Sequence, residues 1–181
     1  MTEELEVLTV VTRRLESARI PYMVTGSIAA NYYAVPRMTR DIDLVVELSA
    51  DDTDRVCALF EADFYVDRDA VRGAIAERGI FNLIHQAYVL KLDFIIKKDS
   101  EYRRAEFARR RRVTVDSHGF FIVAPEDLII SKLDWARDTR SEIQLADVRN
   151  LLASIPDLDV EYLARGTDQL GLGHLYREVA G

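Results

Sequence analysis

The chain has 181 residues, a formal net charge of −7 and a hydrophobic content of 49%. This length fits one domain, and this apolar content is enough to build a core, which excludes a disordered chain. The acidic balance argues against broad, unspecific coating of nucleic acid, although it leaves room for a local basic groove. The single cysteine, Cys57, excludes an intrachain disulfide and fits a reducing compartment.

No apolar run approaches the roughly 20 residues that a membrane-spanning helix needs. The acidic N-terminus, with Glu3 and Glu4, lacks the apolar segment of a signal peptide. We therefore expect a soluble protein of the cytoplasm.

The apolar pattern predicts alternating helices and strands. Apolar residues at helical spacing predict a helix over residues 3–18, which Pro21 separates from a short strand at residues 22–24. A small-residue helix follows Gly26–Ser27, and a β-branched run predicts a strand that begins at Asp41. The remaining predicted elements are a helix through Val56 and Phe60, a strand at 64–66, a helix at 69–78 stopped by Gly79, strands at 80–84, 88–96, 113–115 and 120–123, a helix opened by Pro125, and two small helices at 159–170 and 171–179.

This order of elements predicts an α/β (α+β) fold, with a mixed, twisted sheet flanked by helices. We expect residues 1–124 to form the core of the molecule. Residues 125–181 are expected to form a helical C-terminal part that packs on this core, so that the chain is a single compact unit.

The stretch around Asp41 and Asp43 carries the first candidate for chemistry. Side chains alternate along a strand, so these two carboxylates share one face and repel each other. Mg²⁺ relieves such repulsion, because it takes oxygen ligands from one or two carboxylates and from phosphates. Gly26–Ser27 lies at a strand-to-helix turn, where backbone N–H groups and a hydroxyl form a seat for phosphate. An Asp-x-Asp sequence alone is more often a solvated strand end, so the joint pattern carries the prediction.

Asp93 is an acid inside a strongly apolar strand. A buried carboxylate is costly unless it is paired or metal-bound. One interpretation is a salt bridge to Lys91, which shares its face of the strand. The other is that Asp93 is a third carboxylate on a strand adjacent to Asp41 and Asp43.

A basic run interrupts this acidic chain at residues 103–112, with arginines at 103, 104 and 109–112. It is either a solvated helix end or a patch for a polyanion such as a triphosphate or an RNA backbone. His118 lies in a predicted turn and is expected at the surface.

The pattern formed by Gly26–Ser27, Arg37, Thr39, Asp41 and Asp43 resembles the signature of the DNA polymerase β-like nucleotidyltransferase superfamily. The likeness is greatest to the abortive-infection toxin-type nucleotidyltransferases, and antibiotic nucleotidyltransferases share the broader motif. The resemblance implies a nucleotidyltransferase fold with Mg²⁺ or Mn²⁺ as cofactor.

The resemblance also assigns roles to single residues. It implies that Asp41, Asp43 and Asp93 are catalytic and bind the metal. It implies a nucleotide-binding role for a second set of residues, namely Gly26, Ser27, Arg37, Thr39, Arg40 and Lys132. Lys132 follows a Pro-Glu-Asp-Leu sequence similar to that of the abortive-infection branch, and its bland interpretation is an exposed lysine. The next motif of the family is matched only in part, by Asp147, because its lysine is missing.

These assignments imply an enzyme that transfers a nucleoside monophosphate from a nucleoside triphosphate, such as ATP, to an acceptor hydroxyl. The resemblance suggests the end of a tRNA or a protein as acceptor, a role as the toxin of a toxin–antitoxin pair, and a cognate antitoxin as partner. The alternatives are an antibiotic nucleotidyltransferase, a catalytically silent binding protein of the same fold, and an α/β interaction module whose acids are only surface charges.

Overall fold

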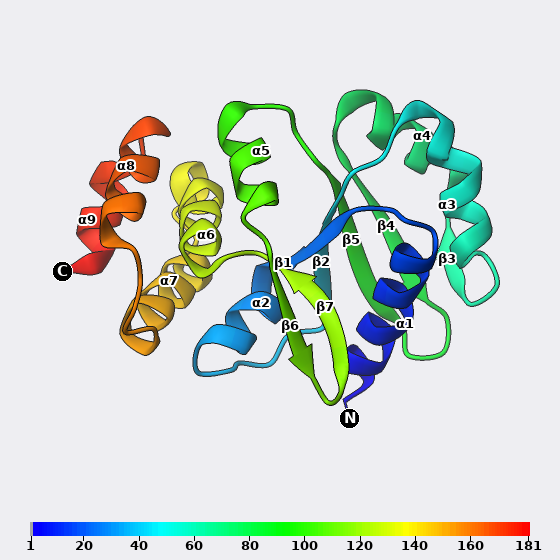
Figure 1. Ribbon diagram of the computed structural model, residues 1–181, viewed down its shortest axis with the longest axis horizontal. Coiled ribbons are helices and arrows are strands. Elements are labelled where there is room, and N and C mark those ends of the chain that lie inside the picture. Colours follow the sequence, from blue (N-terminus) through cyan, green and yellow to red (C-terminus); the bar gives the residue numbers. More distant parts are fainter. Residues whose placement is uncertain (1) are drawn as a thin grey trace.

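The computed structural model describes residues 2–181, and Met1 lies outside the described residues. Within them, a seven-stranded sheet has the strand order β3-β4-β5-β2-β1-β7-β6 (Figure 1). The strands are β1 (Tyr22–Thr25), β2 (Asp41–Val46), β3 (Phe64–Val66), β4 (Ile80–His85), β5 (Leu90–Ile96), β6 (Arg111–Val115) and β7 (His118–Ile122).

Helices pack on this sheet and extend beyond one of its ends. They are α1 (Glu3–Ser17), α2 (Gly26–Tyr33), α3 (Thr53–Phe60, after the 3-10 turn η1 at Ala50–Asp52), α4 (Arg68–Glu77), α5 (Glu101–Ala108), α6 (Pro125–Thr139), α7 (Glu142–Ser154), α8 (Val160–Gln169) and α9 (Gly173–Ala180). The mixed α/β class expected from the sequence is confirmed. Among the described residues, no helix is both long enough and apolar enough to cross a bilayer.

The sheet is mixed because its central pairs run in both directions. β2 pairs with β5 in parallel, whereas β1 pairs with β2 and β4 pairs with β5 in antiparallel fashion. This register places Asn82, Asp93, Asp43 and Thr25 side by side across four strands. Because alternate residues of a strand share a face, the neighbouring row is Ile80, Ile95 and Val45.

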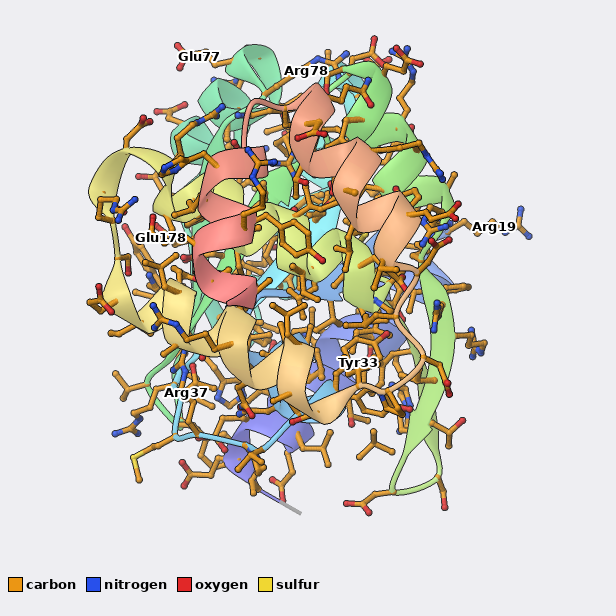
Figure 2. The ribbon with its side chains drawn as sticks, turned by 90° about the vertical axis from the view of Figure 1, so that its left-hand side faces the viewer. Arg19, Tyr33, Arg37, Glu77, Arg78 and Glu178 are labelled. Carbon is orange, nitrogen blue, oxygen red and sulfur yellow. The ribbon has the colours of Figure 1, made fainter. Side chains whose placement is uncertain are left out.

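Helix α6 links the sheet to the C-terminal helices. It begins at Pro125, a favoured first helical residue, and it is buried along most of its length. Figures 1 and 2 show α7, α8 and α9 on the side of α6 away from the sheet. Gly166 of α8 lets the two helices approach, because a Cβ there would lie 2.7 Å from Cδ1 of Ile130. The division of the chain at residue 124 into a core and a C-terminal part stays a prediction.

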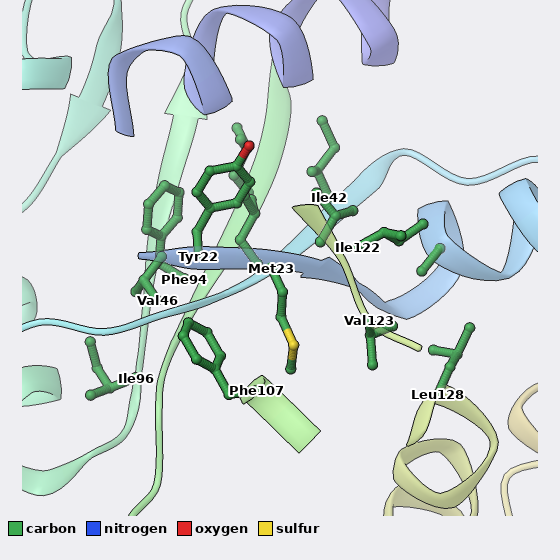
Figure 3. Close-up of a cluster of buried hydrophobic side chains, with 14 of the residues drawn as sticks. Tyr22, Met23, Ile42, Val46, Phe94, Ile96, Phe107, Ile122, Val123 and Leu128 are labelled. Atoms are coloured by element: carbon green, nitrogen blue, oxygen red, sulfur yellow. The ribbon is translucent and has the colours of Figure 1, made fainter. Parts of the chain in front are cut away.

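The core occupies one face of the central strands. Ile42 and Leu44 of β2 are fully buried on this face, where Phe60 of α3 packs edge-to-face on Phe94 of β5. Neighbouring residues on β1 point to opposite sides of the sheet: Tyr22 points toward α1 and Met23 toward Phe107 of α5 (Figure 3). β1 is therefore covered on both faces, whereas the second face of β2, β5 and β4 is partly open.

Two local expectations need correction. Helix α4 ends with Arg78 itself in the left-handed conformation, at φ 51°, whereas Gly79 was expected to stop it. His118 is buried, with its Nε2 2.8 Å from Oγ1 of Thr12, whereas a surface position was expected. Its turn residue Ser117 has a positive φ, so the tight β6–β7 hairpin directs His118 back onto α1.

Three arginines of the basic run, Arg103, Arg109 and Arg110, are engaged in packing contacts and do not form a free patch. Arg103 binds Glu106 and Asp134, and Arg109 binds the fully buried Asp127. Arg110 lies over the rings of Phe107 and Phe121. Arg103 and Arg109 therefore neutralise acids at the junction of α5 and α6, and Arg110 packs on aromatic rings. The side chains of Arg104, Arg111 and Arg112 are more than half exposed.

Candidate active site

Two of the three predicted acids are direct neighbours in the sheet. Asp43 and Asp93 are Cα partners in the parallel β2–β5 pair, and both lie on the partly open face. Asp41 lies two residues before Asp43 on the same face and is paired in register with Lys91. The side chain of Asp41 is 61% exposed, so it stands at the rim of the group.

Gly26 lies against Asp43. A Cβ at Gly26 would be 1.9 Å from Oδ2 of Asp43, and the φ of Gly26 is +64°. Both facts require glycine, which alone adopts this conformation freely and leaves space for the carboxylate. α2 begins at this residue and has no side-chain cap, so its first N–H groups face the acid row without a partner from Thr25. Such groups bind anions.

Burial and charge repulsion both act on Asp43. Burial first, and then the carboxylates of Asp93 and Asp41, together raise the pKa of Asp43 to about 6. Lys132 and Lys91 act in the opposite sense but do not cancel the shift. The row therefore has more negative charge than the protein neutralises.

Asp93 is held by two neighbours. Asn82 of β4 donates a hydrogen bond to its Oδ1, and Nζ of Lys91 lies 3.1 Å from its Oδ2. The same ammonium lies 3.9 Å from Oδ1 of Asp41. The two interpretations of Asp93 are thus combined in the structure, because it is paired with Lys91 and also lies beside the other two acids.

Lys132 belongs to a second polar group, centred on Asp147. Its side chain is only 4% exposed, and Nζ lies 2.8 Å from Oδ2 of Asp147 and 3.0 Å from Oε1 of Gln144. The bland interpretation of an exposed lysine is wrong. Burial lowers the pKa of Lys132, although the hydrogen bond to Asp147 acts against this shift.

Arg37 joins Asp147 to Ser27. Its Nε and Nη2 donate to the two oxygens of Asp147 at 2.8 and 2.9 Å, and Nη2 also donates to Oγ of Ser27 at 2.7 Å. Figure 2 shows Arg37 near the end of the molecule where α7 lies. Burial raises the pKa of Asp147, but hydrogen bonds from Arg37 and Lys132 outweigh it and hold the pKa below its usual value.

Two predicted nucleotide-binding residues stand apart from this network. Arg40 is exposed and forms no salt bridge among the residues that the structure describes. The hydroxyl of Thr39 donates only a long hydrogen bond, 3.5 Å, to the carbonyl of Asp41. Both flank the acid row in the loop that leads into β2.

A cavity of about 360 Å³ opens beside the Gly26–Ser27 turn. Its floor is the row Val45, Ile95 and Ile80, and its opposite wall includes Trp135 of α6. Asp43 and Lys132 line one end, and Arg78, Lys97 and Lys98 line the other parts, whereas Asp41 and Asp93 lie outside the lining. The volume is within the range of small-molecule sites.

The acid row has the donor chemistry that a divalent cation needs. Across residues 2–181, no group of three or more His, Cys, Asp or Glu side chains is arranged to hold a metal on its own. Asp43 and Asp93 offer hard carboxylate oxygens in register. The pKa of Asp43 is raised by its burial and by the charges of Asp93 and Asp41, and a cation would favour the ionised carboxylate. Mg²⁺ is commonly bound in this way, by one or two carboxylates together with water and substrate phosphates. The donor set therefore fits Mg²⁺ or Mn²⁺.

Sequence reasoning missed Asn82 and gave Asp147 little weight. Asn82 lies on the hairpin strand opposite Asp93, and the alternation of side chains along the two strands could have placed both on one face. No signal linked Asp147 to Arg37, because 110 positions separate them and the contact depends on how α7 packs against α2.

Comparisons with known proteins support the fold. No protein-family model and no curated protein sequence matches the chain. Solved structures do match. An antigenic nucleotidyltransferase-like protein from Paracoccidioides brasiliensis is 16% identical, with a TM-score of 0.57 over 97% of this chain and 90% of that one. The antibiotic-resistance factor ANT(2'')-Ia is 14% identical, with a TM-score of 0.59 over 95% of both chains.

A lincosamide antibiotic adenylyltransferase, LnuA, solved with lincomycin bound, is 14% identical, with a TM-score of 0.55 over 86% of this chain and 99% of that one. These likenesses show that the chain has the nucleotidyltransferase fold, as the motif around Asp41 and Asp43 implied. The abortive-infection branch stays a prediction.

Proposed function

We propose that this chain is a nucleotidyltransferase, dependent on Mg²⁺ or Mn²⁺, that moves a nucleoside monophosphate from a nucleoside triphosphate to an acceptor hydroxyl. One observation carries the proposal: Asp43 and Asp93 lie in register on adjacent strands, directly opposite Gly26 at the start of α2. An under-neutralised acid pair facing free helix N–H groups suits a cation together with the phosphates that it accompanies.

The two polar groups of the site, the acid row and the group around Asp147, have different proposed roles. Asp43 and Asp93, with Asp41 at the rim, would hold the cation, which supplies charge neutralisation at the phosphates when bound. The N–H groups of α2 and the hydroxyl of Ser27 bind the β- and γ-phosphates. Because Oγ of Ser27 already accepts a hydrogen bond from Arg37, its own hydrogen is free to point toward a phosphate oxygen.

Lys132 lies at the same end of the cavity as Asp43 and neutralises the triphosphate. Arg37, Thr39 and Arg40 lie outside the cavity lining and would contact the triphosphate from the segment that leads into β2. Asp93 accepts the proton of the acceptor hydroxyl. The acceptor oxygen then bonds to the α-phosphorus, and the bond to pyrophosphate breaks. Phosphoryl chemistry of this kind depends mainly on positioning and charge, which these side chains provide.

The acceptor is proposed to be the end of a tRNA or a protein hydroxyl, in a toxin with a cognate antitoxin. Asp93 lies outside the cavity, on the open face of β4 and β5, where Ile84 and Tyr65 are exposed. A small acceptor is usually enclosed on most sides, whereas the end of a macromolecule can approach an open face. This placement of Asp93 favours a macromolecular acceptor.

An antibiotic acceptor is the second candidate, since one similar structure is an antibiotic-resistance factor and another is a lincosamide antibiotic adenylyltransferase. The cavity disfavours a polycationic antibiotic. Of its lining acids other than Asp43, both Glu106 and Asp134 are already paired with Arg103. A cationic ligand would therefore find Asp43 as its main free carboxylate, and that carboxylate is needed for the chemistry.

The experiment incubates the protein with each α-labelled nucleoside triphosphate and a pool of total RNA or of lysate protein, with Mg²⁺ or with EDTA. We expect label to enter RNA or protein, and pyrophosphate to be released, in the presence of Mg²⁺ but not in the presence of EDTA. Nucleotide binding without either product would favour the silent binding protein. Thermal stability that responds to neither nucleotide nor metal would favour the interaction module.

A further inference from the structure

Lys91 occupies a place that the proposed function reserves for a cation. It extends from β5 on the same face as Asp93 and is the register partner of Asp41. Its ammonium lies 3.1 Å from Oδ2 of Asp93 and 3.9 Å from Oδ1 of Asp41. One positive charge therefore bridges the two acids at the outer edge of the row.

The other oxygen of Asp93 is also engaged. Asn82 donates to Oδ1, so the carboxylate has one oxygen on a neutral amide and one on an ammonium. The amide fixes the plane of the carboxylate without neutralising it. Oδ2 is thus the oxygen oriented for a cation, and in this structure Lys91 covers it.

We propose that Lys91 is an internal counterion that competes with the divalent cation for Asp41 and Asp93 and swings away when the cation binds. The inference rests on the proposed function, because it takes these acids to be the ones that hold the metal. An ammonium on a flexible four-carbon stem is well hydrated, and the Lys91 side chain is already 45% exposed. Moving it into solvent therefore costs little.

Competition between Lys91 and the divalent cation would affect the order in which metal and nucleotide bind. Without nucleotide, Lys91 limits repulsion between Asp41 and Asp93 and lowers the affinity of the row for free metal. When triphosphate oxygens supply additional ligands, the divalent cation outcompetes the ammonium. The site would then fill mainly with the metal–nucleotide complex.

The test measures Mn²⁺ affinity of the full-length, nucleotide-free protein by titration calorimetry or electron paramagnetic resonance. Lys91→Met keeps the length of the side chain and removes its charge. We expect Mn²⁺ to bind about two- to fivefold more tightly to this variant, the range expected for loss of a partly exposed charge pair. Lys91→Arg keeps the charge and should restore affinity to the wild-type level or below it.

A matched control is Arg72→Met, which removes one positive charge from an exposed ion pair with Asp69, on α4. It should leave Mn²⁺ affinity unchanged. If Lys91→Met does not fold, as judged by its thermal melt, Lys91→Gln supplies the neutral side chain. Equal or weaker Mn²⁺ binding by the neutral variants would overturn the inference, as would tighter binding by Arg72→Met to the same degree.

The two proposals can fail separately. Mg²⁺-dependent label transfer by the wild type, together with unchanged Mn²⁺ affinity in Lys91→Met, would overturn the role of Lys91 and leave the transferase standing. Tighter Mn²⁺ binding by Lys91→Met without any transfer would support the counterion and count against the enzyme.

Discussion

Gly26 and Asp43 are in direct contact, with no space between them for even a methyl group. This contact brings the start of α2 onto the acid row and sets the distance between the phosphate seat and the carboxylates. The proposed chemistry depends on that distance. The contact also gives a sharp way to perturb the site with one atom.

Gly26→Ala should abolish transfer and destabilise the fold. The new Cβ would meet Oδ2 of Asp43 at 1.9 Å, in addition to the strain of a positive φ. Gly171→Ala is the matched control, because Gly171 has a φ of +70° but open space around its Cβ position. Left-handed strain alone costs about 1–2 kcal/mol, so thermal melts should show a clearly larger loss for Gly26→Ala. Equal losses, with transfer intact, would contradict the contact.

Asp147→Asn should weaken both stability and activity. It leaves Lys132, almost fully buried, without its carboxylate, and it removes the charge partner of Arg37, which donates a hydrogen bond to Ser27. Breaking a buried pair in this way typically costs about 3–5 kcal/mol, which denaturant unfolding can measure. The double variant Lys132→Met with Asp147→Leu should recover part of the stability but none of the transfer. Recovery of transfer would show that neither charge is needed.

The raised pKa of Asp43 predicts a pH dependence of stability. Its carboxyl ionises near pH 6 in the folded protein and near 4 in the unfolded chain, so the folded state binds more protons between these values. The contribution of Asp43 to stability is therefore lost as pH rises from about 4 to 6. In EDTA, Asp43→Asn should gain roughly 1 kcal/mol relative to wild type between pH 5 and pH 7.5. A difference that stays constant with pH would contradict the raised pKa of Asp43.

Arg109→Met should destabilise the protein without a specific effect on nucleotide binding. Arg109 binds the fully buried Asp127 and lies 3.9 Å above the ring of Tyr162. Its loss should cost about 3 kcal/mol or more, because a buried carboxylate is left with hydroxyl partners alone. The control Arg104→Met removes an exposed pair with Asp99 and should cost about 1 kcal/mol or less. If folded Arg109→Met protein lost affinity for nucleotide, the result would support the interpretation of the basic run as a patch for a polyanion.

Much of the fold and part of the site follow from local patterns in the sequence. Alternation along residues 41–46 and 90–96 places Asp43 and Asp93 on a shared face once the strands are adjacent. The pairing of β2 with β5 is a tertiary contact that local patterns do not predict, and the family resemblance was what suggested it. The partners of Arg37 and of the arginine run depend on how α5, α6 and α7 pack, and no local period encodes that.

His118 illustrates the same limit. Its turn context favoured the surface, but the hairpin folds back on α1, where Thr12 accepts or donates a hydrogen bond. A turn residue is exposed only when nothing packs over the turn. The roles proposed for Asp41, Thr39 and Arg40 concern binding to a metal or a triphosphate. Contacts within the chain do not test these roles, so they stay predictions.

Pyrophosphate release tests the central claim most directly. Wild-type protein, Asp43→Asn, Asp93→Asn and the control Asp138→Asn, which changes an exposed acid on α6, would be compared with nucleoside triphosphate, acceptor pool and Mg²⁺. We expect release from the wild type and from Asp138→Asn, and a loss of at least about a hundredfold in the other two. Undiminished release by folded Asp43→Asn and Asp93→Asn would contradict the acid pair as the catalytic centre.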